Sequence, residues 1–214
     1  MKIYKSLADL PTQLSPAAIA LGTFDGLHIG HRQLVEKVIT SAKESGGVSV
    51  LFTFSNHPRA ILFPDHSPKL LMTQERKAQL LADMGLDILV TIPFTEEFFK
   101  ITPQNFVALL VKSLQPYLIV IGDNYSYGYK GQGNSEMMRQ AGQLLGFAVE
   151  VFAMVTKDGA TVSSTLIRSL LTDGKVQEAM NFLGRPYELQ GLVVTGDQRG
   201  RLLGFPTANV AVDP

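Results

Sequence analysis

The sequence has no cysteine, and its charges balance. Without cysteine the chain has no disulfide, no thiolate metal ligand and no cysteine nucleophile. Lysine plus arginine and aspartate plus glutamate each total 19, whereas nucleic-acid binders usually carry a basic surplus. No apolar run approaches the about 20 residues of a membrane span, and residues 1–9 lack the apolar stretch of a signal peptide. We therefore expect a soluble, cytoplasmic protein that binds neither nucleic acid nor membrane; its oligomeric state stays open.

What is present is an alternation of short apolar runs with segments of helical periodicity. The 214 residues, 45% hydrophobic and 18% charged, suit a globular chain of one or two domains. Apolar runs predict five strands, at 17–21, 48–54, 87–92, 117–121 and 148–152. Helical spacing predicts helices at 31–45, 73–84, 102–114, 134–145, 165–171 and 175–183. This order predicts an α/β fold with a Rossmann-like, doubly wound, parallel five-stranded sheet.

The pattern changes after Gly184. Residues 187–195 predict a strand, and turn residues follow it. This segment indicates the beginning of a β-rich domain that is too short to bury a core of its own. We therefore expect a first domain at 1–185 and a fragment of a second at 186–214.

The first predicted strand ends in a segment suited to phosphate, Gly22 to His31. Ligands of open α/β sheets bind where a strand hands over to a helix, and the helix N-terminus offers free N–H groups. His28 and His31 share a face of the first turn, and Gly30 lets a phosphate approach the backbone. The two imidazoles could stabilise charge that develops during phosphate transfer. The alternatives are a plain capped helix and a zinc site, although no cysteine completes the latter.

A second candidate phosphate site begins at the predicted helix 165–171. Ser163 and Ser164 precede it, and Ser164 is expected to cap the helix. Thr165 and the first amides would meet phosphate oxygens, and Arg168 would grip phosphate with two N–H groups. The alternative is an ordinary capped helix with a solvated arginine.

An aromatic loop follows the fourth predicted strand. It contains Asn124, Tyr125, Tyr127 and a third tyrosine at 129. Tyrosine faces suit a flat ring, the amide suits polar ring edges, and three exposed tyrosines would be unfavourable without a ligand. An ordinary surface loop is the alternative. In a doubly wound sheet the strands 17–21 and 117–121 are neighbours, so this loop would face the histidines across one crevice.

These segments carry a resemblance to a known family. Residues 22–31 resemble the His-x-Gly-His signature of the nucleotidylyltransferase superfamily, and their Phe-Asp-Gly triplet resembles the N-terminal domain of bacterial bifunctional riboflavin kinase/FAD synthetases. Three later segments resemble the family's Phe-x-Pro-His-Pro, Gly-x-(Asp/Asn)-Phe-x-Phe-Gly and Ser-Ser-Thr-x-Ile-Arg motifs: 52–58, 121–128 and 162–168. Asn56 replaces the usual first proline, and tyrosines at 125 and 127 replace common phenylalanines. Residues 183–187 and 204–209 resemble the domain junction and the nucleotide and magnesium segment of riboflavin kinase.

The resemblance implies an FMN adenylyltransferase that converts ATP and FMN to FAD and pyrophosphate with Mg²⁺. The implied catalytic residues are His28, His31 and Arg168. The implied nucleotide-binding residues are Gly22, Thr23, Phe24, Asp25, Gly30, Ser163, Ser164 and Thr165. The implied flavin-binding residues are Phe54, His57, Asn124, Tyr125 and Tyr127. No side chain of the transferase domain is implied to bind metal, whereas Thr207 and Asn209 are implied to do so in the kinase-like fragment.

Two other functions stay open. The acceptor could be another phosphorylated compound, such as phosphopantetheine, a choline-type phosphate or nicotinamide mononucleotide. The chain could also bind flavin or nucleotide without turnover. Because the rest of the kinase, with its expected catalytic acid, is absent from these residues, we expect no riboflavin kinase activity and either a truncated piece or a natural short form.

Overall fold

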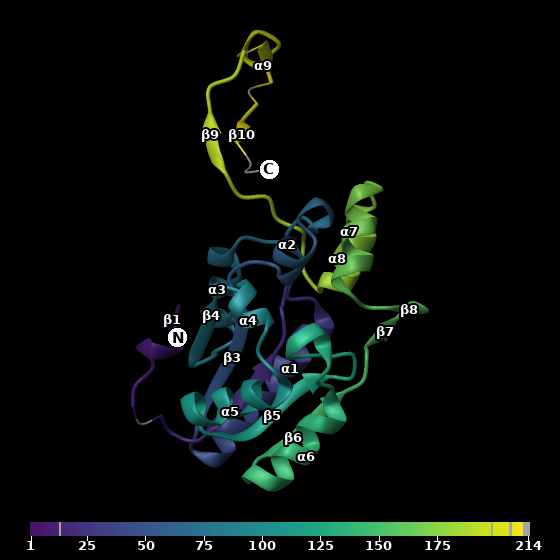
Figure 1. The fold of residues 1–214 in the computed structure, drawn as a ribbon. Helices are drawn as coiled ribbons and strands as arrows, with labels where there is room; N and C mark the ends of the chain where they lie inside the picture. Colours follow the sequence, from purple (N-terminus) through teal and green to yellow (C-terminus); the bar gives the residue numbers. More distant parts are fainter. Residues whose placement is uncertain (13, 198, 206, 212–214) are drawn as a thin grey trace.

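A six-stranded parallel sheet forms the centre of the molecule, in the order β1-β4-β3-β2-β5-β6 (Figure 1). The computed structural model describes residues 1–12, 14–197, 199–205 and 207–211. The strands of this sheet are β1 (Lys2–Tyr4), β2 (Ala17–Leu21), β3 (Val48–Phe54), β4 (Ile88–Ile92), β5 (Pro116–Gly122) and β6 (Ala148–Phe152). The chain winds outward from β2 through β3 to β4 and then returns to β5, so β2 and β5 meet at the switch point. The predicted doubly wound α/β fold is confirmed.

The prediction of five strands was wrong by one, because it omitted β1. This strand has three residues, and its side chains are exposed or only half-buried. Lys2 pairs with Ile88 and Tyr4 with Val90, so β1 extends the sheet beyond β4. A short edge strand with no buried apolar run gives no periodic signal in the sequence.

Helices cover both faces of the sheet (Figure 1). The four longest are α1 (Ile29–Ser45), α3 (Gln74–Asp83), α5 (Pro103–Leu114) and α6 (Ser135–Leu145). Successive residues of β2 point to opposite faces: Ile19 packs in one core cluster with α5 and α6, and Ala20 in another with α1 and α3. Because every residue of β2 is buried, its sequence is continuously apolar, as expected for a central parallel strand.

Smaller elements complete the α/β body. The short helices are α2 (Pro58–Leu62), α4 (Glu96–Phe99), α7 (Ser164–Thr172) and α8 (Val176–Leu183), with 3₁₀ turns η1 (Leu7–Asp9), η2 (Pro64–His66) and η3 (Tyr129–Gly131). The strands β7 (Thr156–Lys157) and β8 (Ala160–Thr161) form a tight antiparallel hairpin. α7 and α8 pack on each other in a third apolar cluster, which includes Leu71 from the segment before α3. Within the described residues, no helix is both long and apolar enough to span a membrane.

The C-terminal segment forms a separate hairpin that projects from the α/β body (Figure 1). It consists of β9 (Leu192–Val194), α9 (Arg199–Leu202) and β10 (Asn209–Ala211), and β9 pairs with β10 in antiparallel fashion. This confirms the expected start of a β-rich unit, although the strand predicted at 187–195 is shorter than expected. All residues of both strands are exposed, so the hairpin buries no core. Residue 206 of the predicted segment 204–209, and residues 198 and 212–214 of the predicted second domain, lie outside the described residues.

Candidate active site

A cavity of about 920 Å³ opens at the carboxyl ends of the central strands. Its wall includes all the predicted site residues of the transferase domain except Asp25. The loop after β2 brings the two histidines, the loop after β5 brings the tyrosines, and α7 brings its N-terminus and Arg168. Because β2 pairs directly with β5, the predicted meeting of the first two loops across one crevice is confirmed.

The histidine loop contains an unusual backbone turn. Phe24 and Leu27 have positive φ angles of 50° and 38°, although neither is glycine, and Gly26 has a φ of 80°. Both apolar side chains are fully buried, and their burial helps to hold the turn in this conformation. Residues in this region of backbone space persist only where surrounding contacts determine them, and they concentrate at functional sites. The strain therefore lies directly before His28.

The two imidazoles stack on each other at the start of α1. Their ring centroids are 3.6 Å apart with an interplanar angle of 15°, and Phe24 packs against His31 at 5.1 Å. His28 is the N-cap of α1, and its Nδ1 accepts a hydrogen bond from the backbone N–H of His31. This bond leaves the ring proton of His28 on Nε2. Among the described residues, Nδ1 of His31 is buried without a hydrogen-bond partner.

Both imidazoles are neutral near neutral pH. Burial, aided by the positive charge of Arg185, lowers the pKa of His28 to about 4. Burial also lowers the pKa of His31 well below 6.5, and His28 and Lys77 add to this effect. Neutral rings keep one N–H donor each, so the pair can donate hydrogen bonds to an anion without first losing a proton.

The low pKa of His28 predicts a loss of stability in mild acid. In the unfolded chain this ring binds a proton near pH 6.5, whereas in the folded chain it stays neutral down to about pH 4. The unfolded state therefore gains protons first, and the free energy of unfolding falls as the pH drops through this window. Between pH 7 and pH 5 we expect His28 to account for about 2 kcal/mol of the fall.

Urea unfolding at several pH values measures this effect. The His28→Asn variant retains a good N-cap side chain, but residue 28 no longer titrates. Between pH 7 and pH 5 its free energy of unfolding should therefore fall by about 2 kcal/mol less than that of the unaltered chain. The matched control is His66→Asn, because His66 is exposed in η2. Equal pH dependence in His28→Asn and in the unaltered chain would contradict a buried neutral His28.

The N-terminus of α7 differs in detail from the sequence prediction. The cap is Ser163, whose Oγ accepts from the N–H of Leu166, and not Ser164 as predicted. The hydroxyl of Ser164 instead donates to the backbone carbonyl of Asp25 at 2.8 Å. The position of Ser164 explains the change, because it is the first helical residue and faces the histidine loop. α7 is thereby tied directly to that loop.

Arg168 is held in place by protein groups rather than solvated. Its Nη2 forms an ion pair with the carboxylate of Asp25, and its Nε donates to the carbonyl of Lys69 at 2.8 Å. The Asp25 carboxylate also accepts from the N–H of Leu71 at 3.0 Å, and Asp25 is 3% exposed. Asp25 was predicted to bind nucleotide, but it lies behind the cavity wall and orients Arg168.

The aromatic end of the cavity is more enclosed than the sequence indicates. Tyr125 and Tyr127 stack with centroids 5.9 Å apart, but Tyr127 is buried and packs on Phe106. Tyr125 is half-buried, and burial raises the pKa of its phenol well above 10. The expectation of an exposed tyrosine loop was therefore wrong, because α5 covers one side of it. Asn124 is exposed at the cavity wall.

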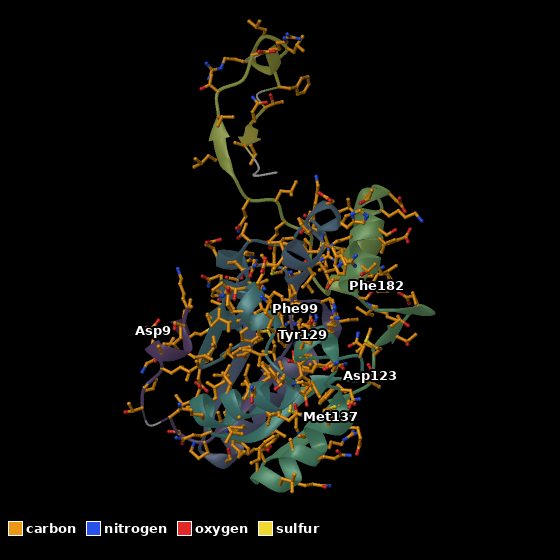
Figure 2. All side chains as sticks on the ribbon, viewed as in Figure 1. Asp9, Phe99, Asp123, Tyr129, Met137 and Phe182 are labelled. Atoms are coloured by element: carbon orange, nitrogen blue, oxygen red, sulfur yellow. The ribbon has the colours of Figure 1, made fainter. Side chains whose placement is uncertain are left out.

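Phenylalanines that the sequence analysis did not single out complete this end. Phe94, Phe98 and Phe99 follow β4 and line the cavity. Figure 2 labels Phe99 and Tyr129, whose ring centroids lie 5.2 Å apart. The carboxyl ends of parallel strands lie at the same edge of a sheet. The aromatic residues just after β4 could therefore have been predicted from the sequence to line this cavity.

The segment after β3 contributes one loop-bridging side chain and one helix cap. Asn56 donates to the carbonyl of Phe94 at 3.0 Å and accepts from its N–H at 2.7 Å, which fixes the loop after β4. His57 caps α2, because its Nδ1 accepts from the N–H of Arg59. Phe54 packs edge-to-face on Phe94 with centroids 5.0 Å apart. Asn56 thus has a definite role in place of the usual proline: it joins two loops of the aromatic end.

The kinase-like residues lie outside this site. Thr207 precedes β10 and Asn209 begins it, and both are exposed in the C-terminal hairpin. Among the described residues, no group of three or more histidine, aspartate or glutamate side chains is placed to hold a metal ion.

Comparisons of the sequence with known proteins agree with the resemblance of the motifs. A family model described as FAD synthetase matches residues 10–166, and one described as riboflavin kinase matches residues 183–214. A protein of Buchnera aphidicola named bifunctional riboflavin kinase/FMN adenylyltransferase is 33% identical over 99% of this chain and 69% of its own length. Proteins of the same name from Listeria monocytogenes and Escherichia coli are 37% and 31% identical, over 91% and 98% of this chain.

The chain spans only 62% of the Listeria protein and 68% of the Escherichia coli protein. A crystal structure described as a macrolide-efflux protein from Streptococcus pneumoniae is also similar, with a TM-score of 0.88 and 30% identity. The similarity covers 98% of this chain and 68% of that one. The sequence motifs, the switch-point cavity and these relatives agree, and the chain belongs to the FAD synthetase family of bacterial riboflavin kinase/FMN adenylyltransferases.

Proposed function

We propose that this chain is an FMN adenylyltransferase, which transfers the adenylyl group of ATP to the phosphate of FMN. The observation that carries the proposal is the composition of one cavity. Its first end combines two neutral imidazoles, a helix N-terminus and Arg168, which suit phosphates. Its other end is aromatic, with Phe54, Tyr125 and Tyr127 on its wall, and suits a flat ring system.

The reaction is an in-line displacement at phosphorus. A phosphate oxygen of FMN forms a bond to the α-phosphorus of ATP, and the bond from that phosphorus to the bridging oxygen breaks. Pyrophosphate leaves with the electron pair, and no protein nucleophile takes part. Such transfers require mainly positioning and stabilisation of charge. His28 and His31 supply these by donating hydrogen bonds to the oxygens around the α-phosphorus.

The start of α7 and Arg168 hold the leaving group in this proposal. The first amides of α7 and the side chain of Thr165 face the β- and γ-phosphates. Arg168 lines the same wall with Asp25 behind it, so its fork is oriented before substrate arrives. Gly22 and Gly30 have no side chain and let the nucleotide approach the backbone closely, and Thr23 lines the wall beside Gly22.

The flavin lies at the aromatic end. The face of Tyr125 stacks on the ring system, while Asn124 offers an amide to its polar edge. Phe54 and His57 close the opposite wall. The buried ring of Tyr127 stacks on Tyr125 and holds it in position.

Magnesium enters as part of the substrate. The cavity presents imidazoles, amides and a guanidinium, and a phosphate chain carries the oxygen ligands that Mg²⁺ prefers. We therefore expect pyrophosphate release to follow the concentration of the MgATP complex when Mg²⁺ is titrated at fixed total ATP. Turnover that saturates at a Mg²⁺ concentration unrelated to the formation of MgATP would point to a separate protein-bound ion.

We place the transferase in residues 1–185 and a riboflavin kinase fragment in residues 186–214. The described residues of the fragment bury no core, so the 214-residue chain is expected not to phosphorylate riboflavin. Formation of FMN from riboflavin and ATP by this chain would contradict this expectation.

The test is pyrophosphate release from MgATP with FMN, together with chromatographic detection of FAD. Riboflavin, phosphopantetheine and nicotinamide mononucleotide serve as parallel acceptors. FAD formation with FMN alone would support the proposal. Turnover only with another acceptor would overturn the flavin assignment, and flavin binding without pyrophosphate release would identify a binding module.

A further inference from the structure

Two cationic side chains, the buried Lys77 and the half-buried Arg185, contact the histidine loop from outside the cavity. Lys77 of α3 lies outside the recognised motifs, and Arg185, which follows α8, lies in the predicted domain junction 183–187. Neither side chain lines the cavity wall. Lys77 is 3% exposed, and its Nζ donates to the carbonyl of Thr23 at 3.0 Å. Arg185 donates from Nη2 to the carbonyl of Gly26 at 2.7 Å and from Nη1 to that of Leu27 at 3.0 Å.

These contacts fall on the strained part of the loop. Thr23 immediately precedes Phe24, and Gly26 and Leu27 both have positive φ angles. Each of the three carbonyls is held by a cation, and the carbonyl of Asp25 between them accepts from Ser164. A conformation that is unfavourable in isolation is thus fixed by two long cationic side chains, from α3 and from the segment after α8, and by a serine hydroxyl of α7.

We propose that Lys77 and Arg185 are positioning residues that hold the turn 23–27, and through it His28 and His31, in the geometry needed for adenylyl transfer. The inference rests on the proposed adenylyltransferase function. It adds two residues to the reaction, neither of which touches the substrates. Arg185 lies where the proposed transferase domain, residues 1–185, overlaps the riboflavin kinase match, residues 183–214.

The same cations act on the charge state of the imidazoles. Arg185 faces His28 and Lys77 faces His31, and each lowers the pKa of the ring beside it. Asp25 and Arg168 also carry charge at this loop and form an ion pair with each other. Glu188, Arg32 and Arg76 carry charge close enough to act on Arg185. Removing either cation is therefore expected to raise the pKa of one identified histidine.

The test uses the full chain with the substitutions Arg185→Met and Lys77→Met. We expect kcat for FAD formation to fall on the order of tenfold in each variant, with the KM values for ATP and FMN changed much less, because the loop is displaced rather than the substrates. Imidazole NMR provides a second measurement, since the chain has only four histidines. The pKa of His28 should rise in Arg185→Met, and that of His31 in Lys77→Met.

Arg76→Gln is the matched control. Arg76 is next to Lys77 in sequence and pairs with Glu188 at 2.6 Å, so it tethers the same C-terminal segment as Arg185 without an observed contact to the loop. It should retain the kcat of the unaltered chain. If Arg76→Gln lowers kcat as much as Arg185→Met does, the effect belongs to docking of the segment and the proposal is overturned.

Two conservative variants separate hydrogen bonding from charge and replace the methionine variants if those do not fold. Arg185→Lys keeps the charge but loses the two-pronged contact, so kcat should fall while the pKa of His28 stays low. Lys77→Gln removes the charge, so the pKa of His31 should rise. Folded variants with unchanged kcat and unchanged histidine pKa values would overturn the proposal. If the unaltered chain makes no FAD, the proposed function fails. The NMR measurement still tests whether Lys77 and Arg185 act on the two histidines.

Discussion

Replacing His31 with alanine is expected to lower kcat for FAD formation by about 10²–10³-fold. The ring lines the cavity beside His28, and burial holds its pKa well below 6.5. A preorganised neutral donor needs no rearrangement when negative charge builds at the α-phosphate, so its loss affects the transition state more than the bound substrate. We therefore expect the KM for ATP to change only a few-fold. Steady-state pyrophosphate release measures both constants.

The size of the His31 ring requires a second variant. Alanine would remove the contacts of the ring with Phe24 and His28, which could move the loop. His31→Gln keeps bulk and an N–H donor, and should retain more activity than alanine. His66→Ala, in an exposed position, is the control and should behave like the unaltered chain. Near-normal kcat in His31→Ala would remove this residue from the mechanism.

Much of the fold could be predicted because its signals are local. Each central strand is a buried apolar run, and helices begin at recognisable caps such as Thr102, whose side chain accepts from the N–H of Asn105. Strand β1 and helices α2 and α4 could not be predicted in this way. They have three, five and four residues and no buried side chain, so neither periodicity nor burial marks them.

The site could be predicted only as far as the backbone topology determines it. The loops after β2 and β5 meet because parallel strands end at one edge of the sheet. By contrast, Lys77 reaches Thr23 across 54 residues and Arg185 reaches Leu27 across 158. Contacts between a side chain and a distant backbone carbonyl leave no pattern in either segment. The ion pair of Asp25 with Arg168 joins side chains 143 residues apart and likewise leaves no local pattern, so Asp25 was assigned to the nucleotide.

Replacing Asp25 with alanine is expected to lower the free energy of unfolding by about 4 kcal/mol. The carboxylate is 3% exposed and has two partners, the guanidinium of Arg168 and the N–H of Leu71. Its removal leaves the cation and the amide without that partner in a site that water reaches poorly, and an unpaired buried charge is costly. Adenylyl transfer should also weaken, because Arg168 loses the group that orients it. Urea unfolding and kcat measure the two effects.

A double-mutant cycle with Arg168→Met shows how the loss arises. We expect most of the lost free energy of unfolding to arise because Arg168 is left as an unpaired charge. In that case Asp25→Ala should destabilise the Arg168→Met variant much less than the unaltered chain. The coupling energy isolates the ion pair from the hydrogen bond to Leu71, which only Asp25→Ala removes. A loss below about 1 kcal/mol in the single variant would mean that solvent screens the pair as it does at exposed positions. In that case the carboxylate would orient Arg168 without stabilising the fold, and kcat would fall while the unfolding midpoint stayed in place.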